Sequence, residues 1–213
     1  MTRYRTIVAD PPWPMPKTGR RSLTSTDGTR YELPNGKKVD GAWWGKTTGK
    51  SVELPYETMT LEAIASLPVG DFAAPAAHLY VWTTNRFLEE TFGILRAWGF
   101  KAKPVILTWG KTPMGLGFGG AYSSTSEFCL FSRRGGLKHL SREDSTWWAW
   151  RRPFENGHHV HSAKPEAFLD MVERVSPGPR LEMFSRRARL GWDVWGDEAL
   201  GHVDLPAVRG TGS

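Results

Sequence analysis

The chain has 213 residues, of which 39% are hydrophobic and 23% are charged, and its net charge at neutral pH is +6. This size and composition predict one soluble domain with one core and exclude a membrane span, because no apolar stretch reaches the ~18 residues that a span requires. The polar start is not a secretory signal, and the single Cys129 excludes an intrachain disulfide, so we expect a cytoplasmic protein in which this thiol is buried in the core.

The first predicted strand covers residues 6–9 and leads directly into Asp10-Pro11-Pro12-Trp13. Two consecutive prolines must end the strand, because each lacks an N–H group and has φ held near roughly −65°. The sheet leaves the carbonyls of Asp10 and Pro11 unpaired at this turn. A carboxylate, a fixed carbonyl and an indole ring at the end of a strand indicate a clamp for a planar ring that bears an amino group.

A basic insertion is predicted at about residues 14–52. Its first 37 residues, 14–50, carry eight Lys and Arg against three acidic residues, which accounts for five of the six net positive charges. Tyr31, Trp43 and Trp44 are interleaved among the charges. This mixture favours a nucleic-acid footprint, in which cations contact phosphates and rings contact bases or sugars. A solvated, partly disordered insertion is the alternative.

Strand and helix signals alternate through the rest of the chain. Apolar periodicity, capping residues and breakers place the elements as follows: helices over 60–67, 85–98 and from Pro165 to about 175, and strands over 78–84, 105–109, 128–131, 180–185 and 192–196. Such alternation predicts an open, doubly wound α/β sheet with ligands beyond the carboxyl ends of the strands. The first strand has no β-α unit before it, which suggests a permuted strand order. We expect one domain over residues 1–200 and a flexible tail over 201–213.

Three other signals do not fit the functions that they resemble. Residues 115–120 match the GxGxxG spacing, but a strand signal follows them where a dinucleotide site needs a helix, so we expect a loop over the site. Residues 45–51 resemble a P-loop that is one residue short and has no preceding strand. His158, His159 and His161 are close together without a cysteine, and we expect solvated loop histidines and no metal site.

Eight ordered motifs resemble the DPPW-type N6-adenine methyltransferases, the family that includes the catalytic subunit of the messenger-RNA adenosine methyltransferase and small bacterial and phage DNA enzymes. They are Asp10-Pro11-Pro12-Trp13, residues 54–59, Trp82, and residues 109–112, 126–129, 161–166, 177–186 and 191–196. The resemblance implies S-adenosylmethionine as the methyl donor. It also implies a Rossmann-like sheet in the permuted, beta-class order with helices on both faces.

The resemblance assigns the acceptor side of the site to two groups of residues. Asp10, Pro11, Pro12 and Trp13 would form the catalytic turn, with Asp10 and the Pro11 carbonyl accepting hydrogen bonds from the adenine amino group. Four further residues would contact the target base: Tyr56, Trp109, Lys111 and Glu127. Aromatic core packing is the alternative role for Tyr56 and Trp109, and structural ion pairing is the alternative for Glu127.

The donor side is implied in the same way. Lys164 would reach the donor carboxylate, and Glu182 and Arg186 would surround its ribose and methionine parts, with Asp10 close to the donor as well. Asp197 and Glu198 occupy positions where the family holds the adenosine with amides. Carboxylates can accept from ribose hydroxyls but cannot donate to adenine nitrogens, so this contact must differ in kind. With only nine residues before Asp10, we expect the upstream strand of longer relatives to be missing.

The function implied is direct in-line methyl transfer to the N6 amino group of adenine in DNA, by a monomer or homodimer of bacterial or phage origin. RNA adenosine is the alternative substrate. A non-catalytic nucleic-acid-binding subunit of a methyltransferase complex is a third possibility, against which the intact Asp10, Trp13 and Lys164 argue.

Overall fold

A computed structural model of the protein describes residues 2–14, 30–32, 38–40, 57–111, 122, 124–155, 158–160, 163–185 and 187–196. The chain divides into two compact units, one of Met1–Trp13 with Met59–Ser213 and one of Pro14–Thr58. The second unit contains the basic segment and an antiparallel pair of strands, β2 (Arg30–Glu32) and β3 (Lys38–Asp40). The fold and the site below belong to the first unit.

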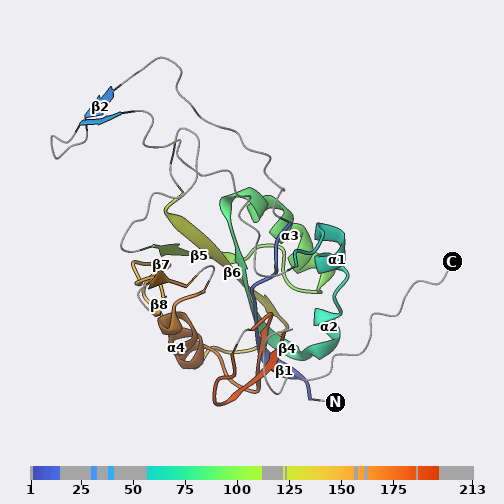
Figure 1. The fold of residues 1–213 in the computed structure, drawn as a ribbon. Coiled ribbons are helices and arrows are strands. Elements are labelled where there is room, and N and C mark those ends of the chain that lie inside the picture. Colours follow the sequence, from blue (N-terminus) through green and yellow to red (C-terminus); the bar gives the residue numbers. More distant parts are fainter. Residues whose placement is uncertain are drawn as a thin grey trace. The chain divides into compact units, whose positions relative to one another are not determined.

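A seven-stranded mixed sheet forms the centre of the first unit (Figure 1). Its strands lie in the order β11 (Trp192–Trp195), β10 (Arg180–Met183), β1 (Tyr4–Ala9), β4 (Ala73–Thr83), β6 (Ser126–Arg134), β5 (Val105–Gly110), β7 (Trp147–Trp148). The first strand of the chain, β1, is therefore central, and the last two strands of the chain, β10 and β11, lie on one side of it. This arrangement confirms the predicted α/β class and the permuted order.

The strand directions decide which residues share an edge of the sheet. β1 is parallel to β4 and β10, and β10 is parallel to β11. β6 is antiparallel to both β4 and β5, so β5 runs in the same direction as β4. The carboxyl ends of β1, β4, β5, β10 and β11 therefore meet at one edge, together with the amino end of β6.

Side chains of the central strands alternate between two apolar layers. Ile7 and Ala9 of β1 belong to the layer that is covered by α1 (Leu61–Ala65), α2 (Val69–Phe72), the 3₁₀ turn η2 (Asn85–Phe87) and α3 (Leu88–Ala97). Val8 belongs to the opposite layer, which α4 (Glu166–Val175) covers. Figure 1 shows α1 to α3 on one side of the sheet and α4 on the other, which is the predicted placement of helices on both faces.

The apolar stripe of α4 explains how this helix is fixed. Phe168, Met171 and Val172 are buried against the sheet, as the sequence spacing predicts. The ring of Phe168 lies 4.6 Å from that of Trp82 and 5.9 Å from that of Tyr80, measured between centroids. Pro165 is the residue before the helix, with ψ of 136°, and not the first helical residue that the sequence suggested.

Some helices and strands begin or end at other residues than predicted, mainly near prolines. β4 begins at Ala73, five residues before the predicted start, because Pro75 is tolerated near the beginning of the strand. Thr60 caps α1 by accepting from the Ala63 N–H, as expected, but the helix ends at Ala65 and a separate α2 follows Pro68. Three strands of two residues were not predicted, since so short a segment carries no periodicity: β7, β8 (Phe154–Glu155) and β9 (His158–His159).

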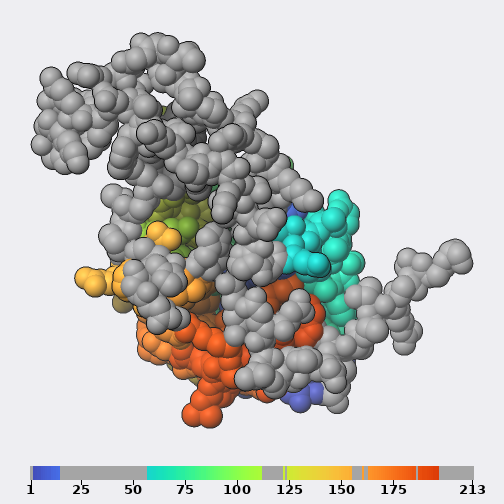
Figure 2. All heavy atoms as spheres, in the orientation of Figure 1, coloured from blue at the N-terminus to red at the C-terminus, as the bar shows by residue number. Residues whose placement is uncertain are grey.

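Segments far apart in the chain meet in the core of the first unit. Ile64 and Val69, near the start of the helical layer, pack in one cluster with Leu181 and Met183 of β10. Figure 2 shows these regions, coloured cyan and orange to red, next to each other. Within the described ranges, no helix is both long and apolar enough to cross a membrane.

Candidate active site

The turn after β1 is held by backbone hydrogen bonds on both of its sides. The Pro11 carbonyl accepts from the Trp13 N–H at 2.8 Å, and the Pro12 carbonyl accepts from the Met59 N–H at 2.9 Å. The Asp10 N–H is 3.4 Å from the carbonyl oxygen of Met183 at the end of β10. The strand therefore ends before Asp10 as predicted, and the carboxylate is presented at the carboxyl edge of the sheet.

Trp13 is packed into the protein in this structure. Its ring is only 8% exposed and stacks on Phe87, with 5.3 Å between centroids and 12° between planes. Its indole nitrogen donates to the carbonyl of Trp82 at 3.0 Å. These contacts anchor the turn to β4 and η2. Stacking of this ring on a bound base stays a prediction.

Four charged side chains form a continuous chain across the edge. The Lys164 ammonium, just before α4, is 2.7 Å from an Asp10 carboxylate oxygen and 3.4 Å from a Glu127 carboxylate oxygen. The other oxygen of Glu127, near the start of β6, forms an ion pair with Lys111, which follows β5. Residues that are far apart in the sequence are thus brought together as the resemblance implied, although the direct Lys164–Asp10 pair was not foreseen.

Each charge in this chain depends on its neighbours. Burial alone would lower the pKa of Lys164, but Asp10 and Glu127 outweigh it and raise this pKa above its ordinary value. Burial would raise the pKa of Glu127, but Lys164 and then Lys111 outweigh it and lower the pKa. Lys164 and Glu127 therefore both stay ionised on either side of neutral pH. Burial and the Asp10 charge raise the pKa of Cys129, which is the inert core thiol that was expected.

Two tryptophans lie beneath the ammonium groups. The Lys164 nitrogen is 5.4 Å from the ring centroid of Trp82, and the Lys111 nitrogen is 5.6 Å from that of Trp109. The two rings meet edge to face at 6.0 Å and 79°. Trp109 is only 3% exposed, and its indole nitrogen donates to the Trp150 carbonyl at 2.8 Å. A direct contact between Trp109 and a base stays a prediction.

The buried indole N–H of Trp82 has no hydrogen-bond partner in the described part of the chain. Trp82 was one of the motif residues but was not assigned to the site. An unpaired buried donor beside Lys164 is the kind of group that a ligand oxygen satisfies.

Glu182, which the resemblance assigns to the donor side, lies on β10 beside Val8 of β1. Burial raises its pKa, a hydrogen bond at 3.1 Å from the Ser185 hydroxyl opposes this, and the charges of Asp10 and Glu166 raise the pKa further. Phe184, in the turn that follows, has a φ of 64°, a backbone conformation that is costly for a bulky residue. A carboxyl group in this environment favours a partner that donates hydrogen bonds, such as a hydroxyl or an ammonium group.

Several predicted residues lie outside the described residues: Tyr56, Arg186, Asp197, Glu198, His161, the GxGxxG segment at 115–120 and the P-loop-like segment at 45–51. The backbone of His158 and His159 forms β9. Within the ranges that the structure describes, no three acidic, histidine or cysteine side chains are grouped as metal ligands.

Comparison with known proteins gives a consistent set of relatives. A model of the MT-A70 family matches residues 38–198. The type II methyltransferase M.MunI from Mycoplasma sp. is 26% identical over 198 residues, which are 92% of this chain and 78% of that protein. The N6-methyladenosine RNA methyltransferase MTA1 from Pyricularia oryzae is 26% identical over 92% of this chain and 47% of its own. A putative N(6)-adenosine-methyltransferase MT-A70-like protein from Medicago truncatula is 30% identical over 70% of this chain and 25% of its own.

Proposed function

Because this chain belongs to the MT-A70 family of methyltransferases, we propose that it transfers a methyl group from S-adenosylmethionine to the N6 amino group of adenine in DNA. Membership of the family confirms the resemblance that the motifs predicted and the expected enzyme class. The observation that carries the proposal is the ion pair of Lys164 with Asp10 at the end of β1, beside the Glu127–Lys111 pair. Its position at the carboxyl edge of the sheet is where α/β proteins bind ligands.

The residues on the donor side fit S-adenosylmethionine, whose role when bound is to supply an electrophilic methyl group. Lys164 has three N–H donors, and a bound carboxylate requires one of them. The Trp82 indole N–H offers a second donor beside it, and the Glu182 carboxyl group can accept from hydroxyl or ammonium groups. The expected roles of Arg186, Asp197 and Glu198 around the donor remain part of this proposal.

On the acceptor side, Asp10 and the Pro11 carbonyl hold the amino group. The Asp10 carboxylate accepts one N–H, and the Pro11 carbonyl, which already accepts the Trp13 N–H, has a second lone pair for the other. Positive charge develops on the amino nitrogen during transfer, and these two acceptors stabilise it. The ion pair with Lys164 orients the Asp10 carboxylate, and the proton leaves to Asp10 or to water. Most of the rate then comes from positioning.

DNA is preferred to RNA as the substrate because of the share of each relative's length that aligns with this chain. The alignment with this chain covers 78% of M.MunI, a larger share than the 47% and 25% that it covers of the two N6-adenosine relatives. The basic segment within Pro14–Thr58 supplies the cations that phosphates require. A duplex substrate would need its adenine flipped out of the stack to reach Asp10.

The proposal is tested by methyl transfer from labelled S-adenosylmethionine to matched DNA and RNA oligonucleotides, each in single-stranded and duplex form. We expect incorporation into DNA that contains adenine and none where adenine is replaced. Asp10→Asn should lower the rate at least ~1000-fold, because one oxygen acceptor and the charge are lost. Binding of S-adenosylhomocysteine, measured by calorimetry, should persist, and Asp71→Asn on the exposed part of α2 is the matched control.

The other outcomes of this assay point to the rival functions. Incorporation into RNA alone would replace DNA with RNA as the substrate. Nucleic-acid binding without transfer or donor binding would identify a non-catalytic subunit.

A further inference from the structure

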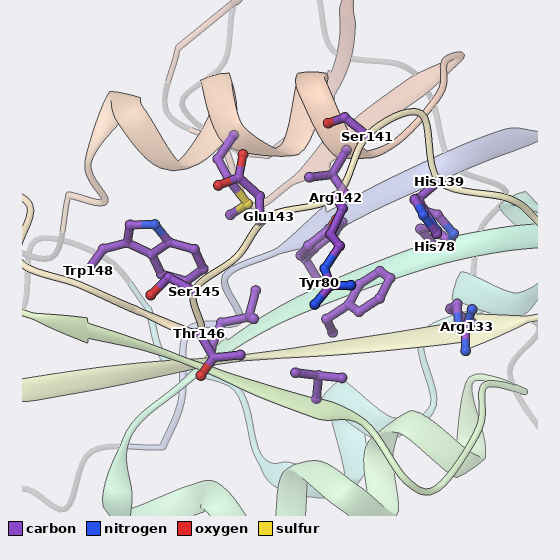
Figure 3. A pocket seen from close by; sticks show the side chains of 15 residues that line it. His78, Tyr80, Arg133, His139, Ser141, Arg142, Glu143, Ser145, Thr146 and Trp148 are labelled. Carbon is purple, nitrogen blue, oxygen red and sulfur yellow. The ribbon is translucent and has the colours of Figure 1, made fainter.

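A pocket lies on the α4 side of the sheet and shares no residue with the Asp10–Lys164–Glu127 network. Its cavity volume is about 320 Å³, within the range of small-ligand sites. Its walls come from β4, β5, β6, α4 and the segment that leads into β7. Figure 3 shows Trp148 at one end, His78, His139 and Arg133 at the other, and Tyr80 and Arg142 between them.

Trp148 and His78, at the two ends of the pocket, lie at different positions along the strands, so the pocket has a long axis. Trp148 is paired with Trp109 near the carboxyl end of β5. His78 is paired with Arg133, where β4 begins its buried stretch and β6 approaches its end. A ligand that contacts both ends must therefore be elongated, running both along the strands and across them from β7 toward β4.

The buried floor of the pocket is aromatic, and its polar atoms are already paired. The rings of Tyr80 and Phe131 are 4.8 Å apart. The Ser176 hydroxyl lies 2.8 Å from both the Tyr80 hydroxyl and His78 Nδ1, and His78 Nε2 lies 3.3 Å from the Leu137 carbonyl. Since that carbonyl can only accept, this network assigns the hydrogen to Nε2, makes Nδ1 an acceptor and directs the Tyr80 O–H to Ser176. The floor thus favours a flat ring surface and not a strongly polar group.

The charged groups of the pocket leave an excess of positive charge. Glu143 is neutralised by Arg174 through contacts of 2.8 and 3.2 Å. Arg142 is 3.4 Å from Asp144, but both side chains are more than four-fifths exposed, so this pair is weak. Arg133 has no carboxylate partner among the described residues. Two guanidinium groups and the His139 imidazole are donors that suit a phosphate group.

We propose that this pocket binds a nucleotide, with its base between Trp148 and the aromatic floor and its phosphate at Arg133 and Arg142. The sugar then lies between the two ends. The same chemistry is present in a free mononucleotide and in one unit of a single strand. The inference does not depend on the proposed methyl transfer, because no residue of the Asp10–Lys164–Glu127 network lines the pocket.

The test uses thymidine 5′-monophosphate, since thymine is not the base that the candidate active site is proposed to hold. Calorimetry with the whole protein should detect binding, with thymidine and inorganic phosphate each at least ~10-fold weaker. Saturation-transfer NMR should show the strongest contact at the thymine protons. The double variant Arg133→Glu with Arg142→Glu should weaken binding at least ~10-fold, and the matched double variant Arg86→Glu with Arg96→Glu, outside the pocket, should not.

Competition with an oligothymidylate distinguishes the two sources. Displacement of the mononucleotide identifies a nucleotide within a strand, and lack of displacement identifies a free nucleotide. The inference is overturned if the wild-type protein binds neither probe, or if the Arg133/Arg142 variant binds both as tightly as the wild type. Methyl transfer measured on the same variants reports separately on the proposed function.

Discussion

At the scale of single residues, Lys164 is the group on which the other charges of the site depend. Its side chain is only 17% exposed, yet it stays charged because Asp10 and Glu127 both contact it. Glu127 in turn joins Lys164 to Lys111. Removing one member therefore changes the charge state or orientation of the others, and the site responds as a unit.

Glu127→Gln should lower kcat/KM for methyl transfer about 10- to 100-fold, because Lys111 and Lys164 lose the carboxylate between them, which corresponds to about 1.4 to 2.8 kcal/mol. The measurement is steady-state transfer to an adenine-containing oligonucleotide. Glu89→Gln on the exposed face of α3 is the control. A Glu127→Gln enzyme with the wild-type rate would show that the network has no part in catalysis.

Glu182 and Glu173 should respond to pH in opposite directions. Burial raises the folded-state pKa of Glu182, so its contribution to stability is full below the ordinary carboxyl pKa of about 4.3 and is lost as pH rises through the folded value. The Arg189 hydrogen bond lowers the pKa of Glu173, so its contribution is present above about 4.3 and is lost as pH falls through the folded value.

At pH 8, Glu182→Gln should therefore raise the free energy of unfolding and Glu173→Gln should lower it, each by roughly 1 kcal/mol. Both differences should shrink toward pH 4. Urea unfolding of the two variants at both values of pH provides the check, and shifts of the same sign would contradict the assigned environments.

At the scale of elements, α4 links the core to the site. Its inner face packs Phe168 on Tyr80 and Trp82, and its outer face binds Arg189 through Glu166, Asp170 and Glu173. Lys164 stands two residues before the helix, so its position at the edge of the sheet depends on how α4 is packed.

Phe168→Ala should lower the free energy of unfolding by about 3 to 5 kcal/mol, since it leaves a cavity between α4 and the sheet. Leu190→Ala, at a side chain that is 99% exposed, should change it by less than about 0.5 kcal/mol. Denaturant unfolding measures both. Equal stability of the two variants would mean that α4 is not held by this stripe.

Elements with a clear period were predictable, and those set by context were not. The stripe of α4 and the continuous run of β4 can be read from spacing, because each repeats over several residues. The start of β4 was missed because Pro75 resembles a breaker, and the pair Trp147–Trp148 became β7 only because β5 offers it an edge. The pairing of strands in the folded sheet determines both elements, and a local sequence pattern contains no information about that pairing.

At the scale of the whole molecule, the residues of the candidate active site are far apart in the sequence and meet only in the folded sheet. The motifs allowed four residues of the site to be predicted: Asp10, Lys111, Glu127 and Lys164. Their contacts could not be predicted, because they depend on the permuted sheet. In it, the end of the central strand β1, the start of β6 and the residues before α4 come together at one edge. The burial of Trp13 against Phe87 could not be predicted, because nothing near either residue in the sequence specifies the other.

The basic segment should give nucleic-acid binding most of its salt dependence. Changing Lys17, Arg20, Arg21 and Lys46 to Gln should flatten the slope of log K against log salt by about 3.6, because each of the four lost phosphate contacts removes about 0.9. Fluorescence anisotropy with a labelled duplex measures the slope. The control changes Arg3, Arg96, Lys101 and Lys103 to Gln, and an equal effect in both variants would contradict the role of the segment.

Nucleoside mass spectrometry of DNA and RNA from cells that express the protein tests the central claim most directly. The account predicts N6-methyladenine in the DNA of cells with the wild-type chain and none above background in cells with the Asp10→Ala variant produced at the same level. The same amount of N6-methyladenine with both chains, or a methylated base other than adenine, would contradict it.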